Sequence, residues 1–211
     1  MINKTLSKNL SSINYLCDRD MVLKNIIIRC GDLNYSLYED YFDFLVYTII
    51  GQMLSNKIGD QLYNRLVNKL NGKLTPEAIN NLGVNKVKEI GISTRKASAI
   101  VELSCAMLKN PNYLTELSKL EDKIIIDSLC KIRGIGLWTI KMFLIFCLDK
   151  EDILPVEDGA FIAAFKIAYN FVDDTRNKKY ISEYCQKWRP YSSYAARYLY
   201  KAYDRGMLVS K

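Results

Sequence analysis

Two glycines in the segment RGIGLWTIK (133–141) could give the chain an anion-binding turn. Gly134 and Gly136 flank Ile135 directly before an apolar run that is typical of a helix. Glycine tolerates a positive φ and allows another backbone to approach closely. The first N–H groups of a helix have no partner within it and lie at the positive end of the helix dipole. The spacing therefore predicts either a phosphate-binding turn or an ordinary connection between two helices, with Ile135 packed beneath it.

A candidate acid follows in the stretch LPVEDGAF. Asp158 directly precedes the apolar segment GAFIAAFKI, so its position predicts an N-cap. Its neighbour Glu157 is a rival acid, which we interpret as a loop charge. The chain has no histidine, so acid–base chemistry would have to use Asp, Glu, Lys, Tyr or Cys.

The cysteines give little support for a metal site. Six are scattered along the chain and none forms a CxxC pair. We therefore expect neither zinc nor an iron–sulfur cluster. Isolated cysteines on apolar segments are typical of buried residues in a reducing cytoplasm, which is the expected location.

Composition and charge indicate a globular protein that either has a polyanionic partner or is simply a basic soluble protein. Hydrophobic residues make up 49% of the 211 residues, and the formal net charge is +7. No apolar run is long enough to span a membrane, and the first residues lack the apolar core of a signal peptide. The stretch 176–211 is the most basic part and is the candidate surface for phosphates, or else a solvated helix face.

The periodicity predicts an all-α fold of about eight to ten helices that would position these residues. Apolar residues recur at helical spacing in several segments, with Thr75 as one expected N-cap and either Ser93 or Thr94 as another. The predicted helical segments are 41–70 (one or two helices), 75–82, 93–110, 122–132, 138–148, 159–170, 178–188 and 192–205. The segment IIIRC (26–30) could be a strand or part of a helix.

Four stretches together resemble the helix-hairpin-helix DNA glycosylase superfamily, in its 3-methyladenine DNA glycosylase II branch. They are the hairpin CKIRGIGLWTIKM with Pro155 and Asp158, FLVYTIIGQMLSNKIGDQL (44–62), ISTRKASAIVELS (92–104) and WRPYSSYAARYL (188–199). The resemblance implies one glycosylase domain in two helical lobes with an active-site cleft between them. One lobe would span about 40–150 and contain the helix-hairpin-helix motif at 130–148. The other would combine about 1–39 with 151–211.

The implied reaction is hydrolysis of the N-glycosidic bond of alkylated purines, 3-methyladenine and 7-methylguanine, in base excision repair. Asp158 matches the family's catalytic carboxylate, which would stabilise an oxocarbenium-like transition state. Such bases are already cationic, so the leaving group needs no general acid. This suits a chain without histidine.

Within the family that the chain resembles, Trp138 distinguishes a glycosylase that only releases the base from one that also cleaves the strand. Bifunctional relatives carry at this position a lysine that forms a Schiff base, and Lys141 does not match it. We therefore expect a monofunctional enzyme without lyase activity. Trp138 and Tyr47 are the candidate pocket aromatics, since electron-rich rings bind cations. Core packing is the alternative for Trp138.

The resemblance also implies residues that contact DNA. Met53, with Gln52 beside it, stands where relatives insert a wedge into the base stack, although Met53 could instead pack in a helix–helix core. The amides near Gly134 and Gly136 and the hydroxyl of Thr139 would hold the DNA backbone. The family's hairpin binds Na⁺ or K⁺ through backbone carbonyls, which here would belong to Cys130, Ile132 and Ile135.

The expected partner is double-stranded DNA containing alkylated bases, bound by a monomer in the cytoplasm, at the nucleoid if the source is bacterial, with no membrane contact. Two alternatives remain open. One is a glycosylase for another damaged base, and the other is a non-catalytic helix-hairpin-helix DNA-binding protein. The second would not need the Pro155 and Asp158 element.

Overall fold

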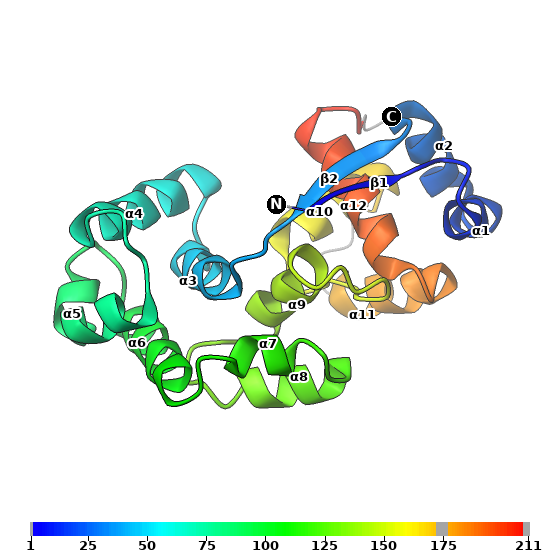
Figure 1. The fold of residues 1–211 in the computed structure, drawn as a ribbon. Coiled ribbons are helices and arrows are strands. Elements are labelled where there is room, and N and C mark those ends of the chain that lie inside the picture. The colour runs from blue at the N-terminus through cyan, green and yellow to red at the C-terminus, as the bar shows by residue number, and fades with distance from the viewer. Residues whose placement is uncertain (1, 172–176, 209–211) are drawn as a thin grey trace. The chain divides into compact units, whose positions relative to one another are not determined.

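The computed structural model describes residues 2–171 and 177–208 of this chain. These residues form a mainly helical protein with twelve α-helices, one 3₁₀ helix and a two-stranded sheet (Figure 1). The prediction of an all-α fold is confirmed, but the expected eight to ten helices were too few. Among the described residues, no helix is long and apolar enough to cross a membrane.

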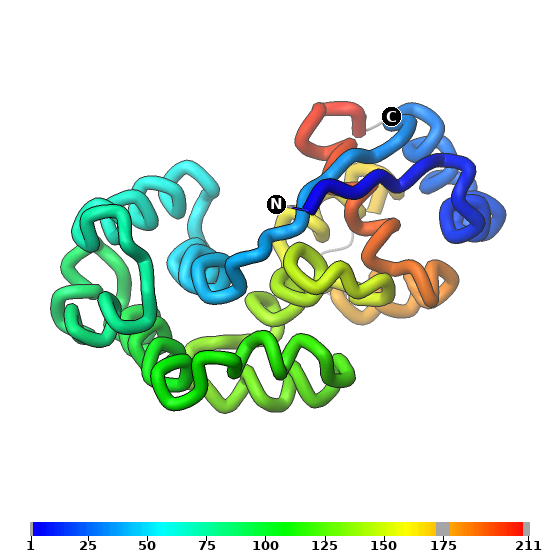
Figure 2. Tube along the Cα trace, viewed as in Figure 1, coloured from blue at the N-terminus to red at the C-terminus, as the bar shows by residue number. Residues whose placement is uncertain are grey.

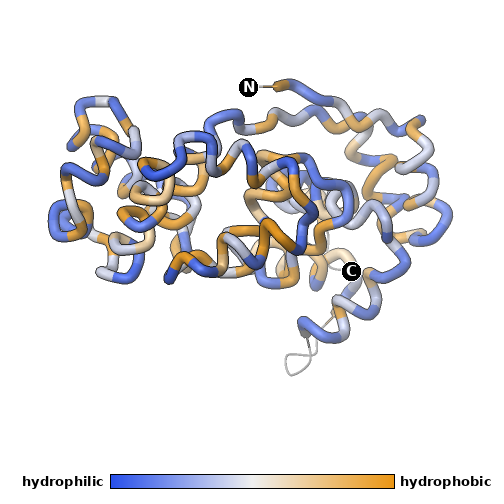
Figure 3. Tube along the Cα trace, turned by 60° about the horizontal axis from the view of Figure 1, so that its bottom comes forward, coloured by the Kyte–Doolittle hydropathy of each residue, from blue (hydrophilic) through white to orange (hydrophobic). Residues whose placement is uncertain are grey.

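The chain folds into two compact units. The first unit, which we call the terminal unit, comprises Met1–Leu37 and Leu144–Lys211, and the second, the hairpin unit, comprises Tyr38–Phe143. Many helices carry both hydrophilic and hydrophobic residues, as expected of amphipathic helices, whereas some segments are almost entirely hydrophobic (Figure 3).

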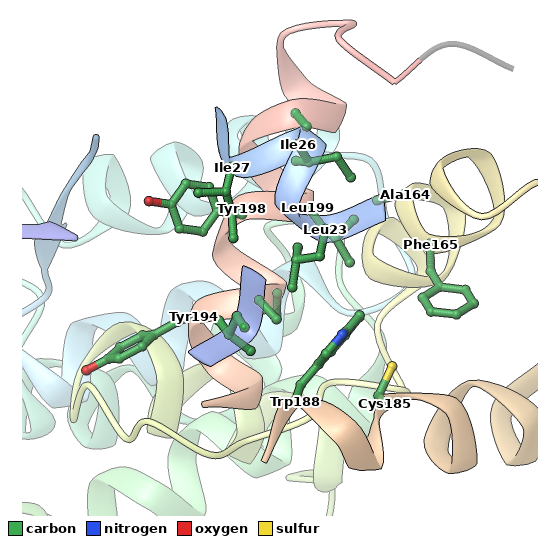
Figure 4. Packing of buried hydrophobic residues seen from close by; sticks show 14 of the residues in the cluster. Leu23, Ile26, Ile27, Ala164, Phe165, Cys185, Trp188, Tyr194, Tyr198 and Leu199 are labelled. Atoms are coloured by element: carbon green, nitrogen blue, oxygen red, sulfur yellow. The ribbon is translucent and has the colours of Figure 1, made fainter. Parts of the chain in front are cut away.

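The terminal unit joins the two ends of the chain around one core. Its elements are β1 (Ile2–Leu6), α1 (Ser11–Arg19), α2 (Met21–Cys30), β2 (Leu33–Leu37), α10 (Gly159–Ala168), α11 (Asn177–Tyr184), the 3₁₀ helix η1 (Cys185–Trp188) and α12 (Ser192–Asp204). Helix α12 packs against α2 and α10. Phe165, Trp188 and Tyr198 are among the large side chains of this core (Figure 4).

A buried carboxylate ties this core together. Asp20 is only 2% exposed. It caps α2 by accepting a hydrogen bond from the Leu23 amide, and it also accepts from Trp188 Nε1 and from the Tyr169 hydroxyl, both at 2.9 Å. Buried donors need such partners, so this one side chain fixes α2 against the C-terminal helices.

The N-terminal segment departs from the helical prediction by contributing two strands. β1 and β2 pair antiparallel, with Ile2 opposite Leu37 and Leu6 opposite Leu33, and run side by side in Figure 2. The ambiguous segment 26–30 belongs to helix α2.

The sequence predicts that the basic stretch 176–211 is either a surface for phosphates or a solvated helix face. Arg176 and Lys211 lie outside the described residues. Arg197 is 5% exposed and donates to Ile145 O and to Asp149, and Arg189 pairs with Asp152 at 2.7 Å. Arg197 therefore holds the terminal unit together, whereas the side chain of Arg189 is paired but remains exposed.

The hairpin unit contains six complete helices and the start of a seventh. They are α3 (Tyr41–Gly51), α4 (Asn56–Lys69), α5 (Pro76–Lys88), α6 (Thr94–Lys109), α7 (Tyr113–Leu117), α8 (Asp122–Leu129) and α9 (Leu137–Phe146), whose last residues belong to the terminal unit. Thr75 caps α5, which confirms that prediction, and Ser93 rather than Thr94 caps α6. Two helices occupy 41–70 because the turn at 52–55 interrupts the pattern.

Candidate functional site

The glycine hairpin connects α8 to α9 and packs on α6. Gly134 has φ 113°, and a Cβ there would lie 2.8 Å from Ala99 Cβ and 3.3 Å from Arg95 O. No other residue fits this position without displacing α6. Gly136 is different, because its φ is not positive and a Cβ there would have no atom within 4 Å. Of the two glycines, only Gly134 therefore uses the positive φ that glycine allows, whereas Gly136 leaves open space at the start of α9.

Two buried isoleucines pack the hairpin against the interior of the hairpin unit. Ile132 and Ile135 are both buried, and the Ile135 amide donates to the Ile132 carbonyl at 3.0 Å. The packing of Ile135 beneath the turn is thus confirmed. Helix α9 begins directly afterwards, with the Ile140 amide donating to Gly136 O at 3.1 Å. A helix therefore starts directly after the hairpin, as the predicted phosphate-binding turn requires, and phosphate binding itself stays a prediction.

A side-chain amide joins this hairpin to the turn between α3 and α4. Gln52 Nε2 donates to Gly134 O at 3.0 Å and to Thr139 Oγ1 at 2.9 Å. Thr139 is 1% exposed, so its hydroxyl serves to hold Gln52 in place. A direct contact of that hydroxyl with DNA stays a prediction that this burial does not favour.

Met53 follows Gln52 and is the most exposed apolar residue of the turn. Its side chain is 101% exposed relative to the reference for methionine. Its φ of 58° lies in the left-handed region, which costs a non-glycine residue about 1–2 kcal/mol. The alternative, that Met53 packs in a helix–helix core, is wrong. The turn can be followed in cyan in Figure 2, where α3 leads into α4.

The predicted pocket aromatics lie on two helices of the hairpin unit. Trp138 is half-buried in the first turn of α9. Tyr47, on α3, donates its hydroxyl to Asp60 at 2.8 Å and meets the Tyr63 ring edge-on, with the centroids 5.3 Å apart. Burial, and then the bond to and charge of Asp60, raise the pKa of Tyr47 to about 12. Tyr47 is therefore neutral at physiological pH.

The Asp158 carboxylate is fixed in the terminal unit by two donors. It caps α10, as predicted, with Oδ2 accepting from the Phe161 amide at 3.1 Å. The same oxygen accepts from the Tyr200 hydroxyl of α12 at 2.7 Å. Before the cap, the Asp158 amide donates to Pro155 O at 3.0 Å, which closes the loop.

Tyr200 is a residue that the sequence reasoning missed. Burial, followed by the charge of Asp158 and the hydrogen bond to it, raises the pKa of Tyr200 well above its ordinary value. The hydroxyl therefore stays protonated and remains a donor. Its ring also contacts Phe146 and Phe161. The helical period of α12 indicates that Tyr200 shares a face with Ala196 and Arg197, but nothing in the sequence pairs it with Asp158.

The fold and the hairpin together define a helix-hairpin-helix protein with an aspartate-capped helix after a Pro-containing loop. A family model described as "HhH-GPD superfamily base excision DNA repair protein" matches residues 46–190. The chain belongs to this family.

Individual relatives agree with this assignment. A putative DNA-3-methyladenine glycosylase of Bacillus subtilis is 32% identical over 129 residues, which cover 61% of this chain and 45% of that protein. The crystal structure of a DNA-3-methyladenine glycosidase from Bacillus halodurans has a TM-score of 0.79 and 28% identity, and the match covers 97% of this chain and 94% of that one.

A third relative supports the fold alone. It is the 3-methyladenine DNA glycosylase of Schizosaccharomyces pombe in complex with abasic DNA, with a TM-score of 0.80, 24% identity, and coverage of 92% of this chain and 97% of that one. In sequence, the matched stretch spans about half the length of the curated relatives.

Proposed function

We propose that this protein is a monofunctional DNA glycosylase that removes alkylated purines, 3-methyladenine and 7-methylguanine, by hydrolysing the N-glycosidic bond. The single observation that carries the proposal is Asp158, a carboxylate held at a helix start by the Phe161 amide and the Tyr200 hydroxyl. The names of the relatives support the substrate class.

Asp158 would act by electrostatics. The departing base leaves positive charge on the sugar, and a fixed carboxylate stabilises this charge without having to reorganise. An alkylated purine already carries a positive charge, so its departure needs no proton from the protein. A chain without histidine can therefore complete the reaction with one carboxylate and a water molecule.

Trp138 supports a reaction that ends at the abasic site. A lysine at this position would form a Schiff base with the sugar and allow strand cleavage. Trp138 offers no nucleophile, and Lys141 lies three residues further along α9, a turn away from it. Trp138 and Tyr47 would instead place electron-rich rings against the cationic base, a contact of about 0.5–2 kcal/mol for each ring.

Met53 is the proposed wedge. A base can leave the stack only if the gap is filled or the unstacking is otherwise offset. The amide of Gln52 is engaged by Gly134 and Thr139, whereas the side chain of Met53 is fully exposed. This contrast favours Met53 over Gln52.

The hairpin would hold the DNA backbone, together with a monovalent cation. Cys130 is the C-cap of α8, where the last carbonyls of a helix lack partners within it. Ile132 O accepts one hydrogen bond from the Ile135 amide, and a carbonyl oxygen has a second lone pair. Backbone oxygens at the negative end of a helix suit Na⁺ or K⁺. The carbonyls of Cys130, Ile132 and Ile135 are thus the proposed ligands, and no zinc or iron–sulfur cluster is proposed.

We further propose duplex DNA with alkylated bases as the partner, bound by a monomer in the cytoplasm. The test is incubation of the full chain with methylated duplex DNA, followed by chromatography of the released bases and electrophoresis of the strands. Release of 3-methyladenine or 7-methylguanine from intact strands is expected. Binding without release would indicate a DNA-binding module, release of other lesions only would indicate another glycosylase, and efficient strand cleavage would contradict the role given to Trp138.

A further inference from the structure

A lysine of α6 closes the C-terminal end of α3. Lys96 Nζ donates to Ile50 O at 2.9 Å and to Gln52 O at 2.6 Å. These carbonyls belong to the last turn of α3 and to its C-cap, where a cation also meets the negative end of the helix dipole. Lys96 is half-buried, and this partial withdrawal of its ammonium group from water lowers its pKa. The two short bonds compensate for this withdrawal.

The residue next to this contact has a strained backbone. Met53 has φ 58° directly after Gln52, the residue whose carbonyl Lys96 holds. Left-handed conformations of non-glycine residues persist only where the surroundings impose them. The backbone of the turn contributes the bond from the Leu54 amide to Gly51 O at 3.0 Å and a longer one from the Gln52 amide to Ile49 O at 3.4 Å. Lys96 supplies the two charged bonds that fix the chain entering the turn.

The side chain of Gln52 provides a second attachment. It donates to Gly134 O and Thr139 Oγ1, which belong to the hairpin and to α9. The backbone of Gln52 is thus held by α6 while its side chain is held by the hairpin. All of these residues lie in the hairpin unit, so these attachments do not depend on the terminal unit.

We propose that Lys96 is a positioning residue that holds the Met53 turn in its inserting conformation and, with Gln52, joins this turn to the glycine hairpin as one rigid element. The inference rests on the proposed role of Met53 as the wedge. The phosphate-binding hairpin and the wedge would then engage DNA in a fixed register, so that holding the backbone also places Met53 at the stack.

The test measures how strongly the full chain prefers a duplex containing a tetrahydrofuran abasic analogue over the same undamaged duplex. A 2-aminopurine beside the analogue reports unstacking. Lys96→Met keeps the length of the side chain but removes the ammonium group. We expect the preference to fall about tenfold, with a smaller fluorescence rise and with binding to undamaged duplex changed by less than twofold. Lys109→Met, at the exposed far end of the same helix, is the matched control and should keep the preference.

A double-mutant cycle separates positioning from general destabilisation. In a Met53→Ala background the wedge is already lost, so Lys96→Met should change the preference by less than twofold. An equal tenfold loss in both backgrounds, or no loss in the wild-type background, would overturn the proposal. Thermal unfolding is recorded for each variant. If Lys96→Met does not fold, Gln52→Ala removes the second attachment and takes its place in the cycle with the same expected pattern.

The cycle also distinguishes the inference from the proposed function. If the wild-type protein releases alkylated bases and prefers the abasic duplex, but Lys96→Met retains that preference, only the inference fails. If the wild-type protein releases no base yet the cycle is non-additive, the positioning role stands and the proposed reaction fails. If the wild-type protein shows no preference for the abasic duplex, the wedge and the role of Lys96 fail together.

Discussion

Replacing Tyr200 by phenylalanine removes one hydrogen-bond donor from Asp158 while the ring contacts with Phe146 and Phe161 are retained. The bond runs from the Tyr200 hydroxyl to Oδ2 over 2.7 Å, and it is shorter than the bond that the same oxygen accepts from the Phe161 amide. A bond to a charged group contributes about 1.5–3 kcal/mol, and phenylalanine avoids the cost of burying a hydroxyl. We therefore expect a loss of about 1–2 kcal/mol in the free energy of unfolding.

The effect on the reaction follows from the freedom that the carboxylate gains. The carboxylate of Asp158 then keeps the Phe161 amide but loses the Tyr200 hydroxyl, so it spends less time in the orientation set by both donors. A tenfold fall in the productive fraction corresponds to about 1.4 kcal/mol in the barrier. Single-turnover excision of 3-methyladenine by the Tyr200→Phe variant should therefore be about tenfold slower than by the wild-type protein.

The assay is base release under single-turnover conditions, with thermal unfolding and duplex binding measured in parallel. Tyr203→Phe is the matched control, because Tyr203 lies on the same helix and is 39% exposed. It should match the wild-type rate and stability. If Tyr200→Phe lowered stability but excised within twofold of the wild-type rate, the hydroxyl would be a purely structural donor. A faster rate would show that the bond weakens the charge of Asp158 instead of orienting it.

Three further outcomes are expected. Asp20→Ala leaves the Trp188 and Tyr169 donors buried without their acceptor, so chemical denaturation should show a loss of about 3 kcal/mol in the free energy of unfolding. A loss below about 1 kcal/mol would contradict the stabilising role given to Asp20. Gly134→Ala should lower the free energy of unfolding by about 2 kcal/mol because of the positive φ and the contact with Ala99, whereas Gly136→Ala should keep its stability but bind duplex more weakly. Calorimetry measures the stabilities and titration measures the binding. Equal stabilities of the two variants would show that the Ala99 contact does not require glycine at position 134. Duplex binding should be several-fold weaker in tetramethylammonium chloride than in KCl of equal ionic strength, whereas equal affinities would argue against the hairpin cation.

The sequence could predict the features that depend on neighbouring residues. Residue type and position predict the caps at Thr75 and Asp158 and narrow the cap of α6 to Ser93 or Thr94. The structure confirms the first two and selects Ser93, and each cap bond spans only three residues. The residue type at position 134 is likewise informative, because glycine allows the positive φ that the structure shows there. The ambiguous segment 26–30 could have been assigned to a helix from Asp20, whose side chain caps α2 a few residues earlier.

Long-range contacts could not be predicted in this way. The bond from Tyr200 to Asp158 joins residues 42 apart, and that from Lys96 to Gln52 joins residues 44 apart. Such pairs depend on how helices pack, which the pattern of a single sequence does not encode. The strand INKTL is short and mostly exposed, so it carries little alternation, and its pairing with residues 33–37 is also a tertiary contact.

The central claim is that the charge of Asp158, and not only its cap, drives base release. Asparagine caps helices about as well as aspartate, so Asp158→Asn should keep the fold, with unfolding free energy within about 1 kcal/mol of the wild-type value. The most direct measurement is single-turnover release of 3-methyladenine from methylated duplex DNA by this variant. If the charge of Asp158 drives base release, the rate is lower by about 100-fold or more, with duplex binding retained. Full activity of Asp158→Asn would contradict it.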